Sequence, residues 1–453
     1  MSDKPPKERS TVVGRVARIA KVGTSVGGAA ARIAGAQMLG LSRDRKTEAA
    51  TLAAALGGLK GPLMKVAQML ATVPDLLPPE YADALSGLQA HAPPMGAAFV
   101  RRRMSAELGP QWASRFQHFD LKAAAAASLG QVHKAAHLDG RALACKLQYP
   151  DMASAVEADL SQLKLIFAVQ RRMDGSIDTR EISTEIGARL REELDYLREA
   201  AHIRLYRHIL RDHDTVSVPG IFEALSTHRL LTMDWLEGAP LLHYRMHALE
   251  DRNAIARTMF AAWWHPFSHY GVIHGDPHLG NYTVRPDLGI NLLDFGCIRV
   301  FPASFVSGVI DLYRALLNGD RALAVAAYES WGFRNLSTEL IETLNIWARF
   351  IYAPLLDDRV RTVADGVKPA EYGRREAFAV HQALRKLGPV KPPREFVFMD
   401  RAAIGLGAVF LHLGAELNFH TLFNSEIEGY DEAALRARQA EAFALARVPA
   451  PLG

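Results

Sequence analysis

The sequence predicts a helix-rich α+β protein. Two strand-type runs, VHKAAH and RALACKLQ, flank Asp139-Gly140, a dipeptide typical of a tight hairpin turn. A second strand-type stretch lies at 217–238 and contains the run THRLLTMDWL. Helical patterns dominate the remaining chain, notably at 151–172, at 180–211 and after residue 250.

The N-terminal part of the chain is also predicted to be helical. Residues 11–72 are rich in Ala, Leu, Val, Arg and Lys and contain few helix breakers after Gly40. Prolines at positions 74, 78 and 79 interrupt this pattern, and HAPP (91–94) forms a second break. An Ala-rich loop precedes the first strand, and the block 271–299 is loop-rich within the helical C-terminal half.

Length and composition exclude several classes of protein. The 453 residues suffice for two to three domains with a large core. Hydrophobic residues make up 49% and charged residues 23%, which excludes a disordered or low-complexity chain. Two cysteines exclude a disulfide framework and a multi-cysteine zinc site. No membrane span is predicted. The few cysteines and the lack of an evident secretory signal favour a reducing compartment.

The positive charge is concentrated at the N-terminus. Residues 1–46 contain ten Lys or Arg and three acidic residues, a net +7, whereas the rest of the chain carries −3. Three interpretations stay open: a basic helix on an anionic membrane surface, a transit peptide, and a solvated helix. This distribution favours a membrane surface over nucleic acid as the anionic partner. We expect a cytoplasmic protein, peripheral at the inner face of the membrane, or a mitochondrial one if the segment is a transit peptide.

The most informative segment is HGDPHLGNYTVRPDLGINLLDFG, residues 274–296. It places Asp276, Asn281 and Asp294 in the order and spacing of a phosphotransferase catalytic loop followed by Asp-Phe-Gly. A short β-hairpin would bring Asn281 and Asp294 to one mouth, where their oxygens suit Mg²⁺. Asp276 would then contact or deprotonate an acceptor hydroxyl, or position a water molecule.

A competing interpretation of this segment is a metal site formed by His274, Asp276 and His278. It is the weaker one, because no further ligand is evident nearby and Pro277 fixes the intervening backbone.

A site of this kind also needs a strand lysine for the nucleotide phosphates and a helix acid that orients it. Lys146 lies in the apolar run ALACKLQ and fits the first role. The following helix offers four acids, which do not all share one face, so two separate roles are plausible: Glu192, Glu193, Asp195 and Glu199.

The Ala-rich loop occupies the position of a phosphate-covering loop. Ala125, Ala126, Ala127 and Ser128 stand where such loops carry glycines. Because alanine restricts the backbone, we expect this loop to be stiff or partly helical, with a helix N-terminus available for phosphate. An ordinary Ala-rich helix cap is the alternative.

Together these residues resemble the UbiB/AarF family of atypical kinases, which includes the coenzyme Q biosynthesis kinase-like proteins. The resemblance covers roughly residues 45–340. It rests on AAASLGQVH (125–133), CKLQYP (145–150), ELDYLREA (193–200), HGDPHLGN (274–281) and LLDFG (292–296). The family's K-x-G-Q motif matches Lys65-Val66-Ala67-Gln68, with alanine in place of the glycine.

The resemblance implies a two-lobed, protein-kinase-like fold with a helical N-terminal extension. It implies ATP or ADP with Mg²⁺ as cofactors and Glu199 as the partner of Lys146. The family's E-x-D motif falls on Glu193 and Asp195, and Lys65, with Gln68 beside it on one helix face, would reach this motif across the substrate cleft. Such an arrangement occludes protein substrates and favours ATPase activity or phosphorylation of a small molecule.

The resemblance also sets the expected domains. They are a basic segment at 1–46, a helical extension at 47–120, an N-lobe at 121–237 and a C-lobe at 238–453. The adenine is expected against the backbone between Asp234 and Leu236.

Three functions are weighed on this basis. The first is an atypical kinase or ATPase linked to isoprenoid-quinone biosynthesis or membrane lipid metabolism, with a small-molecule, lipid or quinone-precursor acceptor. The second is a phosphotransferase of the aminoglycoside or choline kinase type. The third is a membrane scaffold that binds nucleotide without turnover.

Overall fold

The computed structural model describes residues 95–127, 129–157, 160–161, 187–334, 336–364, 366–367 and 394–451. The predictions for Lys65, Gln68, Ser128 and the segment 1–46 therefore lie outside the described residues. The chain divides into two compact units. The first combines Met1–Phe99, Lys122–Val132 and Gln148–Leu194, and the second combines Val100–Leu121, His133–Leu147 and Asp195–Gly453.

In the first unit, the Ala-rich segment is a strand. Strand β2 (Ala125–Ala127) pairs antiparallel with the beginning of β3 (Gly130–His137), and Ala127 lies opposite Gly130. The expectation of partly helical structure with a helix N-terminus is therefore wrong. Pairing with β3 supplies the backbone hydrogen bonds that a helix would otherwise provide.

A small apolar core lies in the same unit. It consists of Leu129, Tyr149 and Met152, with Met95 and Leu194 packed against it. Two hydrogen bonds hold this core together. The Gln148 side chain donates to the Leu194 carbonyl over 3.1 Å, and the Met95 N–H donates to the Gln131 side chain over 2.7 Å.

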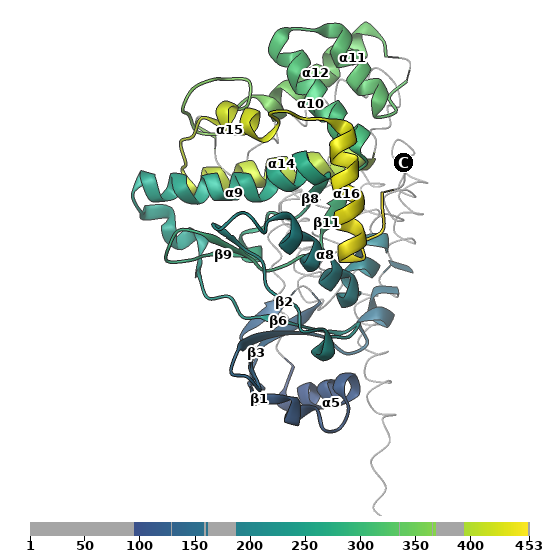
Figure 1. Ribbon diagram of the computed structural model, residues 1–453, viewed down its shortest axis with the longest axis vertical. Helices are drawn as coiled ribbons and strands as arrows, with labels where there is room; N and C mark the ends of the chain where they lie inside the picture. The colour runs from purple at the N-terminus through teal and green to yellow at the C-terminus, as the bar shows by residue number, and fades with distance from the viewer. Residues whose placement is uncertain are drawn as a thin grey trace, which may run out of the picture. The chain divides into compact units, whose positions relative to one another are not determined.

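Helix α5 (Ala97–Leu108) starts in the first unit and continues into the second (Figure 1). It is followed by a 3-10 turn (Trp112–Arg115) and by a sheet of order β1-β3-β4-β6. The strands are β1 (Phe116–Phe119), β3, β4 (Ala142–Gln148) and β6 (Leu230–Asp234). The predicted turn between β3 and β4 is present, with Gly140 at φ +88°. Glycine adopts this left-handed conformation without the strain of a side chain.

Helix α8 (Tyr196–Ile209) follows in the chain and begins at a well-defined cap. The Asp195 carboxylate accepts from the N–H groups of Leu197 and Arg198, over 3.1 and 3.3 Å. A side-chain acceptor at this position satisfies N–H groups that have no partner inside the helix, and so fixes where α8 starts.

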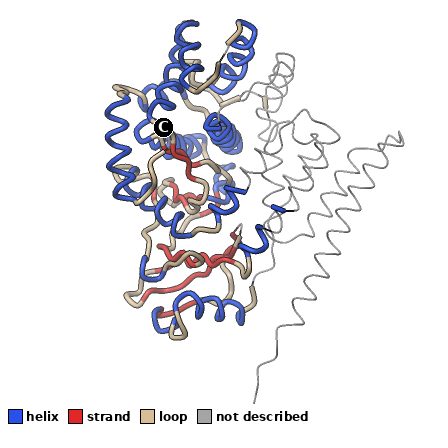
Figure 2. The backbone as a smooth tube through the Cα atoms, turned by 90° about the vertical axis from the view of Figure 1, so that its right-hand side faces the viewer, coloured by secondary structure: helices blue, strands red, loops and turns tan. Residues whose placement is uncertain are grey.

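A second sheet has the order β5-β10-β9-β7 (strands red in Figure 2). Its strands are β5 (Val216–Ser217), β10 (Ile290–Leu292), β9 (Tyr282–Val284) and β7 (Ala239–Pro240). The predicted hairpin before Asp294 is β9–β10, with Leu292 opposite Tyr282. A two-stranded sheet joins β8 (Val272–His274) to β11 (Ile298–Val300). Three 3-10 turns complete this part, at Glu223–Leu225, Leu241–Met246 and Leu279–Asn281.

The rest of the unit is helical, as the pattern after residue 250 predicts. Its helices are α9 (Leu249–Tyr270), α10 (Ala303–Asn318), α11 (Arg321–Ser330), α12 (Thr338–Tyr352), α14 (Arg394–Leu413), α15 (Phe419–Glu426) and α16 (Glu432–Ala446). Helix α9 lies beside α14 and α15 (Figure 1). Its buried aromatic side chains Phe260 and Trp264 pack against aromatic rings at Phe410, Phe419 and Phe423. None of the helices described is long and apolar enough to cross a membrane.

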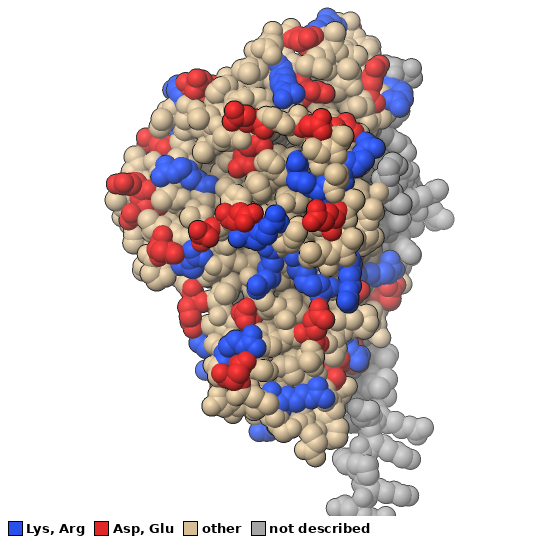
Figure 3. Space-filling model, in the orientation of Figure 1, with Lys and Arg blue, Asp and Glu red and all other residues tan. Residues whose placement is uncertain are grey.

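Charges of both signs are interspersed on the face of the molecule drawn in Figure 3. Several charged side chains of the described residues form ion pairs, such as Arg204 with Glu223 over 3.2 Å. The concentrated positive charge of the sequence belongs to 1–46, which lies outside the described residues.

Candidate active site

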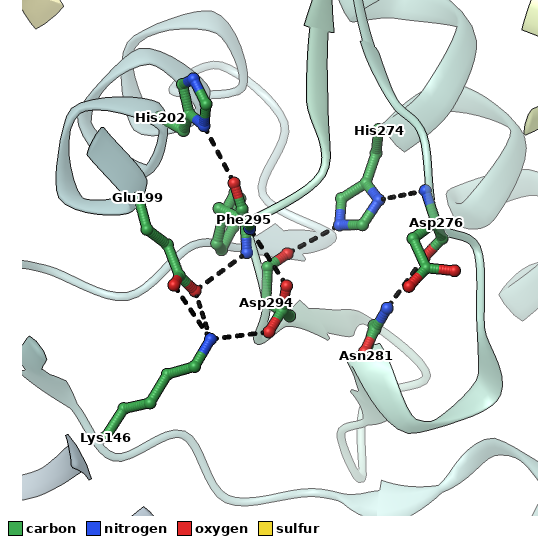
Figure 4. Close-up of polar contacts among 9 residues, drawn as sticks. Lys146, Glu199, His202, His274, Asp276, Asn281, Asp294 and Phe295 are labelled. Atoms are coloured by element: carbon green, nitrogen blue, oxygen red, sulfur yellow. Dashed lines mark hydrogen bonds and ion pairs between the residues drawn. The ribbon is translucent and has the colours of Figure 1, made fainter. Parts of the chain in front are cut away.

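Lys146 lies near the end of β4, and only 6% of its surface is exposed. A buried ammonium group is costly unless it is paired. Its Nζ donates to both carboxylate oxygens of Glu199, over 2.7 and 2.9 Å, and to Asp294 Oδ2 over 2.8 Å (Figure 4). The same Nζ lies 5.3 Å from the centre of the Tyr196 ring, where a cation is attracted to the aromatic face. Three segments far apart in sequence thus meet at one cation.

Glu199 reaches Lys146 from the first turn of α8, directly after the Asp195 cap. A carboxylate there is favoured by the positive end of the helix dipole. Its Oε1 also accepts a hydrogen bond from the Phe295 N–H over 3.3 Å. Glu199 therefore holds both the strand lysine and the backbone of the Asp-Phe-Gly segment.

The protonation behaviour of this pair follows from burial and charge together. Burial acts to lower the pKa of Lys146, but the charges of Asp294 and Glu199 outweigh it and raise the pKa well above its ordinary value. Burial also raises the pKa of Glu199, while the charge of Lys146 opposes this rise. Lys146 is therefore the cation that opposes the effect of burial on the ionised form of Glu199.

Asn281 and Asp294 lie at the same end of the β9–β10 hairpin. The Leu293 N–H donates to the Asn281 carbonyl over 2.9 Å, which holds the residue before Asp294 beside Asn281. The Asn281 amide nitrogen donates to the Asp276 carbonyl over 2.9 Å, so Oδ1 is its atom for a hard cation. Asp294 Oδ1 accepts from the Gly296 N–H over 3.1 Å.

His274 joins the catalytic-loop segment to the Asp-Phe-Gly segment. Its Nδ1 accepts from the Asp276 N–H over 3.2 Å, which places the imidazole proton on Nε2. Nε2 then donates to the Asp294 carbonyl over 2.7 Å. Burial lowers the pKa of His274, in agreement with a neutral ring.

These contacts bear on the alternative metal site at His274, Asp276 and His278. Both ring nitrogens of His274 are engaged, so neither offers a lone pair to a metal ion. The His278 Nδ1 instead accepts from the Gly280 N–H over 3.1 Å. Among the residues that the structure describes, these three side chains do not form a cluster suited to a metal.

His202 was not among the predicted site residues. It lies one turn after Glu199 on α8, is 3% exposed, and its Nδ1 is 3.0 Å from the Phe295 carbonyl oxygen (Figure 4). Phe295 is fully buried and meets the Tyr206 ring edge to face at 5.4 Å. The Asp-Phe-Gly segment is therefore held to α8 at both the N–H and the carbonyl of Phe295. The spacing of Glu199 and His202 on one helix face was the available sequence signal.

The predicted adenine segment begins at Asp234, the last residue of β6. The Asp234 side chain accepts from the Gly220 N–H over 2.7 Å and faces Arg207 at 3.8 Å. Its own N–H donates to the Gly220 carbonyl, and the Trp235 N–H donates to the Ala142 carbonyl. Because the N–H groups of Asp234 and Trp235 are engaged, the predicted contact with adenine depends on the carbonyl groups of this segment and on Leu236.

The remaining predicted residues belong to other contacts. Ala125, Ala126 and Ala127 form β2 of the first unit, which also contains Glu193. Asp195 caps α8 and lies 3.1 Å from His228 Nδ1. The roles of Glu193 and Asp195 opposite Lys65 stay predictions.

A buried strand lysine that pairs with a helix glutamate and with the aspartate of Asp-Phe-Gly is the arrangement of kinase-like proteins. The fold supports the same class. A solved structure of Rv3197 with erythromycin from Mycobacterium tuberculosis matches with a TM-score of 0.59 and 28% identity. The match covers 83% of this chain and 94% of that one.

The chain belongs to the ABC1 atypical kinase-like family, whose model matches residues 87–328. The predicted UbiB/AarF membership is thereby confirmed. Its relatives include the atypical kinase COQ8, mitochondrial, of Saccharomyces cerevisiae, 25% identical over 82% of this chain and 74% of that protein. The atypical kinase coq-8, mitochondrial, of Caenorhabditis elegans is 26% identical over 84% and 51%.

A chloroplastic relative is similar over a shorter region. Protein ACTIVITY OF BC1 COMPLEX KINASE 8 of Arabidopsis thaliana is 31% identical over 57% of this chain and 35% of its own length. Several of the curated relatives are thus matched over only a third to a half of their length.

Proposed function

We propose that this chain binds ATP or ADP together with Mg²⁺ and acts as an atypical kinase or ATPase. The observation that carries the proposal is the buried Lys146, held between Glu199 and Asp294. Family membership supports nucleotide binding.

The residues around Lys146 fit a nucleotide phosphate and a metal ion. An ammonium group has three N–H donors, and those of Lys146 go to two oxygens of Glu199 and one of Asp294. A phosphate oxygen that takes the place of Asp294 keeps Lys146 paired and releases a carboxylate oxygen. With Oδ1 of Asn281, this carboxylate gives the hard oxygen ligands that Mg²⁺ prefers.

Lys146 and Glu199 have one chemical role in this proposal, and Asp276 and His274 have another. Mg²⁺, when bound, neutralises phosphate charge as it develops. Lys146 holds and orients the phosphate, and Glu199 keeps Lys146 in place. Asp276 accepts the proton of an acceptor hydroxyl or positions a water molecule. His274 fixes the backbone of Asp276 relative to that of Asp294.

Thermal unfolding with and without Mg-ATP tests the proposal. Asp294→Asn should abolish the stabilisation by Mg-ATP, whereas Asp311→Asn on α10 should retain it. Lys146→Ala should weaken nucleotide binding, whereas Lys134→Ala should not, because Lys134 is 42% exposed and pairs with Glu237. An unchanged Mg-ATP shift in Asp294→Asn would remove that residue from the metal site.

The link to isoprenoid-quinone or membrane-lipid metabolism comes from the family resemblance and is part of the proposal. A turnover assay with Mg-ATP should show ATP hydrolysis without phosphorylation of peptides. Quinone-precursor mimics and lipid vesicles should raise this rate. Efficient peptide phosphorylation would instead identify an ordinary protein kinase.

The second candidate is a small-molecule phosphotransferase. The structure of Rv3197 with erythromycin favours testing it, since that protein of the same fold was solved with a small molecule. Phosphate transfer from ATP to an aminoglycoside, to choline or to erythromycin would support it. Hydrolysis alone in the presence of each compound would count against it.

We also propose that residues 1–46 contact anionic lipid. Ten basic residues against three acidic ones favour a negatively charged surface. Binding to anionic vesicles should weaken with salt and disappear on deletion of 1–46. Binding that survives the deletion would place the contact elsewhere and would weaken the scaffold interpretation as well. The mitochondrial and chloroplastic relatives leave a transit peptide as the other use of this segment.

A further inference from the structure

A cluster of metal-ligating side chains lies away from Lys146, at the C-terminal end of α9. His265 and His269 stand four residues apart and therefore share one face of this helix. Glu426, the last residue of α15, meets both of them. Its Oε2 lies 3.3 Å from His265 Nδ1 and 3.6 Å from His269 Nε2. The three ligand atoms lie within 4.8 Å of one another.

We propose that His265, His269 and Glu426 bind a divalent transition-metal ion of the zinc class. The spacing of the atoms carries this proposal. Tetrahedral zinc with ligands at about 2.0–2.1 Å separates neighbouring ligand atoms by roughly 3.3–3.4 Å. Of the two distances to Glu426 Oε2, that of 3.3 Å matches this value and that of 3.6 Å slightly exceeds it. They are longer than the distance of about 2.7–2.9 Å that is typical of a charge-assisted hydrogen bond.

His213, which lies between α8 and β5, stands beside this cluster. Its ring centre is 4.3 Å from that of His265, and the His265 and His269 rings are also 4.3 Å apart. The imidazoles of His265 and His269 beside one carboxylate favour zinc, cobalt, nickel or copper over Mg²⁺, which prefers oxygen ligands. The cluster therefore differs in metal class from the oxygen ligands of Asn281 and Asp294.

Packing contacts hold the three ligand side chains in position, and these side chains stay partly exposed to solvent. Trp264 on α9 meets Phe423 on α15 edge to face at 5.3 Å, which fixes the two helices near the cluster. From α16, Arg438 donates to the His269 carbonyl over 3.0 Å. The side chains of His265, His269 and Glu426 are 21%, 31% and 15% exposed. An ion can therefore reach them from solvent.

We assign the ion a structural role. It would join two segments that are far apart in sequence: the end of α9 and the end of α15. Helix α9 ends at Tyr270 with Gly271 as its C-cap, and the chain continues directly into β8, which contains His274. A clamp at this point would hold the strand that carries the catalytic loop.

Zinc binding by the metal-stripped full chain, without an affinity tag, tests the proposal. Isothermal titration with Zn²⁺ alone should show one equivalent bound. His265→Ala, His269→Ala and Glu426→Gln should each weaken zinc binding at least about tenfold. His118→Ala on β1, whose side chain is 67% exposed, and Asp294→Asn should keep the wild-type affinity. Cobalt(II) in place of zinc should give the intense visible absorption of tetrahedral coordination.

Three results would overturn the proposal. They are the absence of saturable zinc binding at micromolar concentration, wild-type affinity in Glu426→Gln, and loss of binding in Asp294→Asn. Glu426→Gln nearly preserves size and shape, so it carries the test even if a histidine variant fails to fold. Because the titration contains no nucleotide, its failure leaves the proposed ATP chemistry untouched.

Discussion

Replacing Lys146 with methionine should destabilise the second unit chiefly through the carboxylate that it leaves at Glu199. Removing one partner of a buried ion pair costs about 3–5 kcal/mol, because the other charge stays buried and unpaired. The Glu199 side chain is 4% exposed, whereas that of Asp294 is 32% exposed and can regain water. We therefore assign most of the cost to Glu199.

This cost should depend on pH with a definite sign. Burial already raises the pKa of Glu199, and removing Lys146 takes away the charge that opposes the rise. A carboxyl group whose pKa is higher in the folded than in the unfolded state costs stability as the pH rises through that interval. The deficit of Lys146→Met should therefore be small near pH 5 and large near pH 8, both approximate values around the ordinary carboxyl range.

Urea unfolding of wild type and Lys146→Met at both pH values measures the effect. Adding Glu199→Gln to Lys146→Met should recover much of the lost stability, since it removes the unpaired charge. Lys134→Met is the matched control and should change the midpoint little, because its ion pair is exposed. A deficit that does not vary with pH, or a double variant no more stable than Lys146→Met, would refute this reasoning.

Three further substitutions address the loops and the extension. His274→Gln should lower both the melting temperature and ATP turnover, because it breaks the link between the two loop segments; wild-type turnover would show that this link is dispensable. Gly271→Ala should lower the melting temperature more than Gly140→Ala. Both glycines have positive φ, but of the two only Gly271 has other atoms where a Cβ would lie, among them Gln439 Nε2; equal losses would contradict this. Lys65→Ala should change nucleotide preference or turnover, and a silent substitution would remove Lys65 from the mechanism.

The sequence predicted correctly those elements that depend mainly on residues close together in the chain. Asp139-Gly140 correctly marked the turn between β3 and β4, and the apolar run before Asp294 correctly marked a hairpin that brings this residue beside Asn281. The lysine and its acid partner were also predicted, although the choice of Glu199 among four nearby acids depended on the family resemblance. The structure brings Lys146, Glu199 and Asp294 into direct contact.

Features that depend on distant pairing were not predictable in the same way. Ala125–Ala127 has a helix-favouring composition, yet it pairs with β3 as a strand because tertiary context outweighs a weak propensity. The parallel pairing of Val216 and Ser217 with β10 joins residues more than seventy positions apart. The hydrogen bonds of His274 and His202 become visible only once the backbone around Phe295 has a position in space.

The shared cation at Lys146 also has a consequence for thermodynamic linkage. Asp294 is both the ligand proposed for the metal and the group that competes with phosphate for Lys146. A metal ion on Asp294 therefore weakens the competitor of the nucleotide, and phosphate on Lys146 frees the ligand of the metal. Binding free energies coupled in this way are reciprocal, so Mg²⁺ should tighten nucleotide binding by the same factor by which nucleotide tightens Mg²⁺ binding. The site would thus respond to the metal–nucleotide complex more strongly than to either component alone.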